Sequence, residues 1–83
     1  MSQLHLEVAG LVQQVTRESE VGPLTRLDGD LLMDSLEFAA LAGLVAQRYG
    51  EHVDLQGFLS GLEIDQIIEL TVSDVAEYIK ARA

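Results

Sequence analysis

The N-terminal segment carries apolar side chains at the spacing of an amphipathic helix. Between Ser2 and about Arg17, apolar residues occupy positions i, i+4, i+7, i+8 and i+11, namely Leu4, Val8, Leu11, Val12 and Val15. This spacing places the side chains on one face of a helix. The Ser2 hydroxyl can cap the helix by accepting a hydrogen bond from a free backbone N–H group. We therefore predict a first helix over residues 2–17.

A long loop is predicted next, over residues 18–33. Two turn signals mark it, Gly22-Pro23 and Asp28-Gly29, because glycine and proline favour turns over regular structure. Four leucines are expected to anchor the loop to the core: Leu24, Leu27, Leu31 and Leu32. The loop is therefore expected to be long but held in place.

A second helix is predicted from Ser35 to about Tyr49. Asp34 lies at the capping position and Glu37 follows three residues later, which is the pattern of a capping box. Gly50 then provides a C-terminal stop. Apolar residues occur on almost every side of this helix, although a core-facing stripe needs only about 100°. The excess indicates that the helix shows apolar surface to a partner or a ligand.

The remaining residues predict an irregular connection and two further helices. Residues 51–62 contain two internal glycines and are expected to be irregular, with about one helical turn. A short helix is predicted over residues 63–70, because three isoleucines have helical spacing: Ile64, Ile67 and Ile68. Thr71 and Asp74 have the spacing of another capping box and precede a last helix, whose inner stripe is Val72, Val75, Ala76 and Ile79.

Together these elements predict an all-α fold, a small four-helix bundle with three principal helices and one short helix. Strand signals are weak, and neither repeats nor low-complexity segments are found in the sequence. We therefore interpret residues 1–83 as a single domain and expect it to be monomeric.

The strong acidity of the chain narrows the classes of partner. Its 83 residues contain 14 Asp and Glu against five Lys and Arg, giving a formal charge of −9 at pH 7, and there is no Cys. This charge opposes binding to nucleic acid or an anionic membrane and favours a positively charged protein surface. The lack of cysteine excludes disulfides, thiolate metal sites and a cysteine nucleophile. Neither a secretory signal nor a transmembrane segment is predicted, so a cytoplasmic protein is expected.

Metal and catalytic motifs are weak. Residues 28–39 place acids at three positions of a calcium-loop register, but Met33 stands where that loop needs Gly and Ala39 where it needs Glu. His5 and His52 are far apart and have no patterned carboxylates beside them. No serine lies in a nucleophile-elbow context, and no glycine-rich loop is present to hold a phosphate. We predict no metal site and no enzymatic activity.

Ser35 is the position with a physical argument for function. A serine in the first turn of a helix lies near free backbone N–H groups and the positive end of the helix dipole, and both favour a phosphate group. Serine is also common at helix starts for structural reasons. The spacing alone leaves both interpretations open.

The sequence around Ser35 resembles the Asp-Ser-Leu signature of acyl carrier proteins. Residues 29–38 contain Asp34-Ser35-Leu36 and open a helix that ends in Arg48-Tyr49-Gly50. Residues 70–79 are similar to the last-helix segment of that family, and the helix and loop upstream have suitable lengths. The resemblance covers essentially the whole chain.

The resemblance implies a carrier protein that catalyses nothing itself. Ser35 would be the attachment point for 4′-phosphopantetheine, transferred from coenzyme A by a phosphopantetheinyl transferase. The arm would supply the thiol that the chain lacks and carry acyl groups as thioesters. Partner enzymes with basic docking surfaces, such as an acyltransferase or ligase and a ketosynthase, would recognise Asp34, Leu36 and Glu37, together with Asp30 in the first loop.

Two features differ from fatty-acid carriers. The second helix has other residues where those carriers repeat acids, Ala40, Ala46, Gln47 and Arg48, and the connection over residues 54–62 is several residues longer. These differences favour a dedicated, polyketide-like pathway. Four residues of this helix could either pack in the core or contact the acyl chain: Phe38, Ala39, Ala42 and Gly43. For Phe38 the core position is favoured, because large apolar side chains are usually buried.

Two alternatives remain. A peptidyl or aryl carrier of nonribosomal synthesis would have the same arm, but typically has Gly-Gly where this chain has Leu32-Met33. An acidic helical adapter without a prosthetic group would need Ser35 to be only a helix-start residue. Modification of Ser35 separates the adapter from both carriers.

Overall fold

Five helices and a long first loop make up residues 2–82, the part of the chain that the structure describes. In this computed structural model the helices are α1 (Gln3–Thr16), α2 (Ser35–Tyr49), α3 (Leu55–Ser60), α4 (Ile64–Glu69) and α5 (Val72–Arg82). Between residues 2 and 82 there is no strand, only an isolated bridge between Arg26 and Thr71. The predicted all-α class is confirmed.

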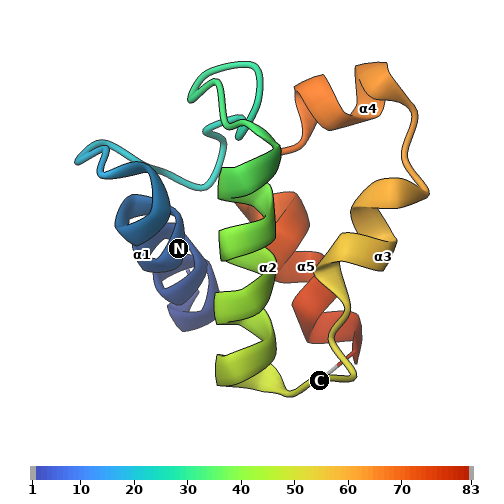
Figure 1. The fold of residues 1–83 in the computed structure, drawn as a ribbon. Coiled ribbons are helices and arrows are strands. Elements are labelled where there is room, and N and C mark those ends of the chain that lie inside the picture. Colours follow the sequence, from blue (N-terminus) through green and yellow to red (C-terminus); the bar gives the residue numbers. More distant parts are fainter. Residues whose placement is uncertain (1, 83) are drawn as a thin grey trace.

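Helices α1 and α2 run antiparallel, and α1 also packs against α5 (Figure 1). Near the start of α1, Glu7 Oε1 accepts hydrogen bonds from Tyr49 Oη at 2.8 Å and from Arg48 Nε at 3.2 Å, at the end of α2. Ser2 caps α1 as predicted, because its hydroxyl accepts from the His5 backbone N–H at 3.2 Å. The Glu7 contacts thus join the N-terminal part of α1 to the end of α2.

The hydrophobic core lies among α1, α2 and α5. Apolar positions of these three helices supply most of its fully buried side chains: Val8, Val12, Leu41, Val45, Val72, Val75, Ala76 and Ile79. No polar or charged residue belongs to the buried set within residues 2–82. Burial of apolar area, at about 25 cal/mol per Å², is therefore what holds the three helices together.

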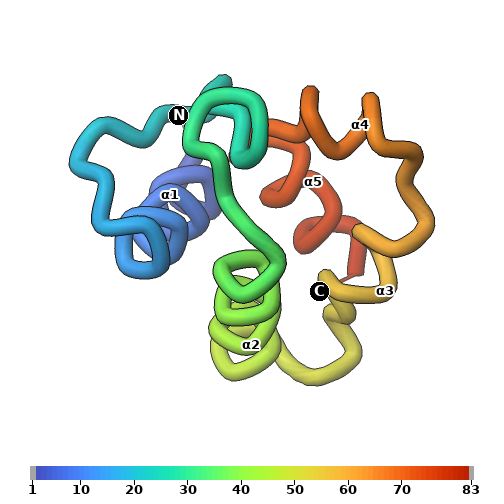
Figure 2. The backbone as a smooth tube through the Cα atoms, turned by 45° about the horizontal axis from the view of Figure 1, so that its top comes forward, coloured from blue at the N-terminus to red at the C-terminus, as the bar shows by residue number. Residues whose placement is uncertain are grey.

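The first loop is anchored mainly by its backbone. It passes beside the junction of α4 and α5 (Figure 2), where Leu27 N donates to Leu70 O at 2.9 Å and Val72 N donates to Thr25 O at 3.1 Å. Leu27 is fully buried there. Leu24 and Leu32, two of the four expected anchors, are instead 79% and 76% exposed. The expectation was wrong for these two, because backbone hydrogen bonds hold the loop while only Leu27 and Leu31 pack on the core.

A fifth helix, α3, forms where the sequence predicted an irregular connection. Asp54 caps it by accepting from Gly57 N at 3.0 Å, and Leu55 and Leu59, one turn apart, are buried. The prediction of four helices was therefore wrong by this one. The cap and the leucine pair outweigh the unfavourable helix propensity of Gly57.

Helices α4 and α5 form close to their predicted positions. Thr71 Oγ1 accepts from Asp74 N at 3.1 Å, and Asp74 Oδ2 accepts from Thr71 N at 3.0 Å, which is the predicted capping box before α5. Helix α4 differs from the others because it contains no buried residue. It stands at the same end of the molecule as the start of α2 (Figure 1).

Candidate functional site

Ser35 is positioned by the end of the first loop. Met33, two residues before it, is buried, and its N–H donates to Leu27 O at 3.1 Å. Asp34 then has extended backbone and caps α2, so Ser35 is the first residue of the helix, as predicted. Its side chain is exposed. The hydroxyl is thus accessible on a backbone that the loop and helix hold in place.

Asp34 and Glu37 form the predicted capping box around Ser35. Asp34 Oδ1 accepts from Glu37 N at 2.8 Å, and Glu37 Oε1 accepts from Asp34 N at 3.2 Å. Within the described chain neither carboxylate forms an ion pair. The capping role is confirmed, and the partner-binding role of these two residues stays a prediction.

Two backbone donors remain free in the first turn of α2. The N–H groups of Glu37 and Phe38 are bonded to Asp34, whereas those of Ser35 and Leu36 have no acceptor among residues 2–82. Free N–H groups at a helix start carry the positive end of the helix dipole. They can therefore bind an anionic group attached to the Ser35 hydroxyl.

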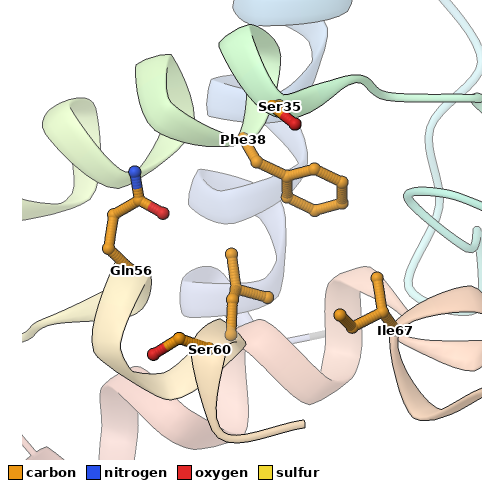
Figure 3. Close-up of a pocket in the computed structure, with 6 residues that line it drawn as sticks. Ser35, Phe38, Gln56, Ser60 and Ile67 are labelled. Carbon is orange, nitrogen blue, oxygen red and sulfur yellow. The ribbon is translucent and has the colours of Figure 1, made fainter. Parts of the chain in front are cut away.

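A pocket of about 280 Å³ lies beside Ser35, between α2, α3 and α4. Figure 3 shows Phe38 and Ile67 reaching toward this space from α2 and α4, with Ser35 next to Phe38. Its lining is completed by three residues of α3: Gln56, Leu59 and Ser60. The pocket thus combines three apolar side chains with polar ones, beside an exposed hydroxyl.

The four ambiguous residues of α2 have different environments. Ala42 is buried in the core. Phe38 is half-buried and packs against the core, as favoured, and it also lines the pocket; its acyl-chain role stays a prediction. Ala39 and Gly43 are exposed, and a Cβ at Gly43 would meet open space.

Asp30 is engaged within the first loop. Its Oδ1 lies 3.1 Å from Arg26 Nη2, and its Oδ2 accepts from Arg26 N at 2.8 Å. The Arg26 guanidinium and backbone N–H hold the pKa of Asp30 below its ordinary value. Arg26 Nη1 also lies 3.4 Å from Glu69 Oε1 at the end of α4. The structure thus joins Asp30 to α4 through Arg26, and its partner-binding role stays a prediction.

Leu36 has the most exposed large apolar side chain among the described residues, at 81%. It does not line the pocket beside Ser35 and lies on the side of α2 that faces α1. Leu36 is therefore available for contact with another molecule, which is the property that its predicted role requires.

The sequence did not identify the contributions of α3 and α4 to the pocket. Gln56, Leu59 and Ser60 belong to the segment expected to be irregular, and Ile67 was predicted only as part of a short helix. The available signal was Asp54 followed by Leu55 and Leu59, a cap before two apolar residues one turn apart. The glycines at 57 and 61 disfavour a helix, and they led to the prediction of an irregular segment.

Searches for other kinds of site gave negative results. Over residues 2–82, no group of three or more His, Asp or Glu side chains is placed to hold a metal ion. None of the helices described above combines the length and apolar character needed to cross a membrane.

The comparisons with known proteins assign no family. No protein-family model matches the chain, and no significant match was found among curated proteins or solved structures. The function is therefore argued from the residues around Ser35.

Proposed function

We propose that this protein is an acyl carrier protein that bears 4′-phosphopantetheine on Ser35 Oγ. The observation that carries the proposal is the position of this hydroxyl, exposed at the first residue of α2 and on the lining of a pocket with the apolar side chains of Phe38, Leu59 and Ile67. A structural serine at a helix start has no need of such a pocket. The resemblance around Asp34-Ser35-Leu36 supports the same residue independently.

The residues around Ser35 suit a phosphodiester. The free N–H groups of Ser35 and Leu36 and the helix dipole favour its negative charge. The negative charges of Asp34 and Glu37 repel a phosphodiester on Ser35. Each carboxylate, however, already accepts a hydrogen bond from a backbone N–H group, which compensates part of its charge. The capping box would keep Ser35 in position while the arm moves.

When bound, the prosthetic group supplies a thiol that carries acyl groups as thioesters. The side chains of Phe38, Leu59 and Ile67 offer an apolar surface for such a chain. At about 280 Å³ the pocket lies just below the range of roughly 300–1,000 Å³ found for small-molecule sites. Short acyl groups are therefore the cargo that it suits.

The charge of the chain suits enzyme partners with basic docking surfaces. With a formal charge of −9, it is attracted to such surfaces. We propose a phosphopantetheinyl transferase, an acyltransferase or ligase, and a ketosynthase, acting on a monomeric carrier in the cytoplasm. The alanines at 40 and 46 leave α2 less acidic than a fatty-acid carrier's and favour a specialised, polyketide-like pathway.

The test is the intact mass of the protein after incubation with coenzyme A and a broad-specificity phosphopantetheinyl transferase. Ser35→Ala is the test variant, and Ser60→Ala is its matched control because Ser60 lines the same pocket. We expect the native chain and Ser60→Ala to gain one phosphopantetheinyl group and Ser35→Ala to gain none. If the folded native chain gains nothing while a control carrier is modified, the proposal is overturned and the acidic adapter becomes the better account.

A further inference from the structure

A second hollow lies at the end of the molecule opposite the start of α2, where α2 leads into α3 (Figure 1). Its volume is about 250 Å³, and it is lined by the connection after α2, by α3 and by the C-terminal part of α5. It shares no lining residue with the pocket beside Ser35. Its lining residues are His52, Asp54, Gly57, Phe58, Tyr78 and Arg82. We call it the α3–α5 hollow.

Two stacked aromatic rings form one wall of the α3–α5 hollow. The ring centroids of Phe58, on α3, and Tyr78, on α5, lie 4.3 Å apart with an angle of 20° between the ring planes. The Tyr78 hydroxyl donates to the Asp54 carbonyl oxygen at 3.0 Å, which holds this ring in place. Both aromatic residues are half-buried, so part of each side chain remains uncovered. A planar aromatic ligand can pack against such a wall.

Two hydrogen-bond donors lie at the rim of the hollow. Arg82 forms no ion pair within residues 2–82, although the chain has 14 acidic residues, and its guanidinium carbon lies 5.5 Å from the centre of the Tyr78 ring. The His52 imidazole lines the same hollow, and both side chains are exposed. A guanidinium presents paired N–H groups that match a carboxylate, and an imidazole can add a further N–H. These two residues can therefore bind a carboxylate together.

Asp54 supplies an acceptor in the same hollow. Its Oδ1 accepts from Gly57 N at 3.0 Å, whereas its Oδ2 has no hydrogen bond among the described residues. A Cβ at position 57 would collide with this carboxylate, so the close approach of the Asp54 side chain to α3 requires glycine there. The free Oδ2 can accept a hydrogen bond from a ligand N–H or O–H group. Because Asp54 repels a simple anion, a bound anion must also bring a donor to it.

We propose that the α3–α5 hollow binds a small aromatic carboxylate whose ring carries an amino or hydroxyl group. The carboxylate would contact Arg82 and His52, the ring would pack beside Phe58 and Tyr78, and the ring substituent would donate to Asp54 Oδ2. The volume of about 250 Å³ is below the usual range for drug-sized ligands and suits a single ring. This binding site does not depend on the proposed modification of Ser35.

Other accounts of these residues explain less. A cation at the end of α5 suits the helix dipole, and the aromatic stack attaches α3 to α5. Neither role requires His52 and the free oxygen of Asp54 to border the same hollow. A phosphate ester carries more negative charge than a monocarboxylate, so Asp54 and the formal charge of −9 disfavour it more strongly.

The probe is 4-aminobenzoate, titrated into the ¹⁵N-labelled chain and followed by NMR. Benzoate lacks the ring donor and 4-aminobenzamide lacks the carboxylate, so the two compounds test the two ends of the ligand separately. Arg82→Gln is the test variant, and Lys80→Gln is its matched control because Lys80 is an exposed cation of α5 outside the hollow. Asp54→Asn keeps an oxygen to cap α3 and replaces the free Oδ2 with an NH₂ group, which cannot accept a hydrogen bond.

We expect 4-aminobenzoate to shift the amide signals of Gly57, Phe58 and Tyr78 saturably, with a Kd below about 1 mM. Benzoate and 4-aminobenzamide should each bind at least about fivefold more weakly. Arg82→Gln should raise the Kd of 4-aminobenzoate at least about fivefold, and Lys80→Gln less than about twofold. Asp54→Asn should remove the preference for 4-aminobenzoate over benzoate.

Three results would overturn this site. The first is the absence of saturable shifts up to about 5 mM ligand, and the second is equal weakening by Arg82→Gln and Lys80→Gln, which would indicate unspecific attraction to positive charge. The third is a set of shifts centred on Ser35 and Ile67, which would place the ligand in the other pocket. Equal affinity for benzoate and 4-aminobenzoate would overturn the proposed contact with Asp54. Intact mass reports the modification of Ser35 separately, so failure of either proposal leaves the other standing.

Discussion

The Asp34 carboxylate lies 2.8 Å from the Glu37 backbone nitrogen, and Glu37 returns the contact by accepting from the Asp34 N–H at 3.2 Å. These two hydrogen bonds close a ring around the first turn of α2, in which Ser35 is the first residue. The ring satisfies two groups that a helix start would otherwise leave without partners. The Ser35 hydroxyl is therefore not needed to cap the helix and is exposed to solvent.

Replacing Asp34 with Ala is expected to destabilise the protein by about 1 kcal/mol, because the Glu37 N–H loses its acceptor. Ser35→Ala should change the free energy of unfolding by less than about 0.5 kcal/mol, since the hydroxyl is exposed and has no hydrogen bond in the described chain. Urea denaturation of both variants at pH 7 measures the two values. A loss in Ser35→Ala as large as that in Asp34→Ala would show that the serine is structural.

Burial in the first loop predicts a contrast between two leucines. Leu27→Ala should cost about 2–5 kcal/mol, because Leu27 is fully buried and its removal leaves a cavity. Leu24→Ala should cost less than about 0.5 kcal/mol, because that side chain is exposed. Thermal and urea unfolding of the two variants provide the comparison. Similar losses would contradict the exposed position of Leu24.

The elements that the sequence predicted well are those encoded by local pattern. Helices α1, α2 and α5 have apolar stripes and side-chain caps such as Ser2, Asp34 and Thr71, and all three begin within a residue of the predicted cap. A cap and a stripe both depend on residues less than two turns apart. Their prediction therefore needed no knowledge of the tertiary structure.

The features that the sequence missed depend on distant contacts. Leu24 and Leu32 look like anchors by composition, but the backbone bonds from the loop to residues 70–73 decide that Leu27 alone is fully buried. Gly57 concealed α3, which is stabilised by burial of Leu55 and Leu59. Of the pocket lining, Ser35 and Phe38 lie on a helix with an unbroken pattern, whereas Gly57 and Gly61 interrupt the pattern of α3. Nothing in the spacing of α4 indicates that Ile67 meets the start of α2.

The contact of Glu7 with the end of α2 predicts a pH-dependent contribution to stability. The hydrogen bond from Tyr49 and the contact with Arg48 lower the pKa of Glu7 below its ordinary value of 4.5. A carboxyl group with a lowered pKa stabilises the fold above its unfolded pKa, and this stabilisation is lost as the pH falls through the folded value. The Glu7 contribution should thus be complete at pH 7 and decline below about pH 4.5.

The measurement is the difference in unfolding free energy between the native chain and Glu7→Gln at pH 7, 4.5 and 3. We expect a stabilising difference at pH 7 that shrinks steadily toward pH 3. Glu18→Gln is the control, because Glu18 is exposed and forms no ion pair among residues 2–82. A Glu7 difference that stays constant with pH would show that its carboxylate does not contribute through these contacts.

Helix α4 is expected to open more readily than α1, α2 and α5. It has no buried residue, and Ile64 is 77% exposed. Its last residue, Glu69, is joined to the first loop by an ion pair with Arg26 at 3.4 Å. Both side chains of this pair are exposed to solvent, so the ion pair is weak and sensitive to salt. Few buried contacts and an exposed tether are the properties of segments that open locally at low free energy.

Amide hydrogen exchange measures this opening. Residues of α4 should exchange faster than those of α1, α2 and α5, and Arg26→Gln should accelerate α4 further while leaving α1 unchanged. Arg48→Gln is the matched control, because Arg48 forms an exposed ion pair with Glu7 away from α4. Protection of α4 equal to that of α5 would contradict the prediction. Since Ile67 of α4 lines the pocket beside Ser35, opening of α4 would also widen that pocket and admit a larger group.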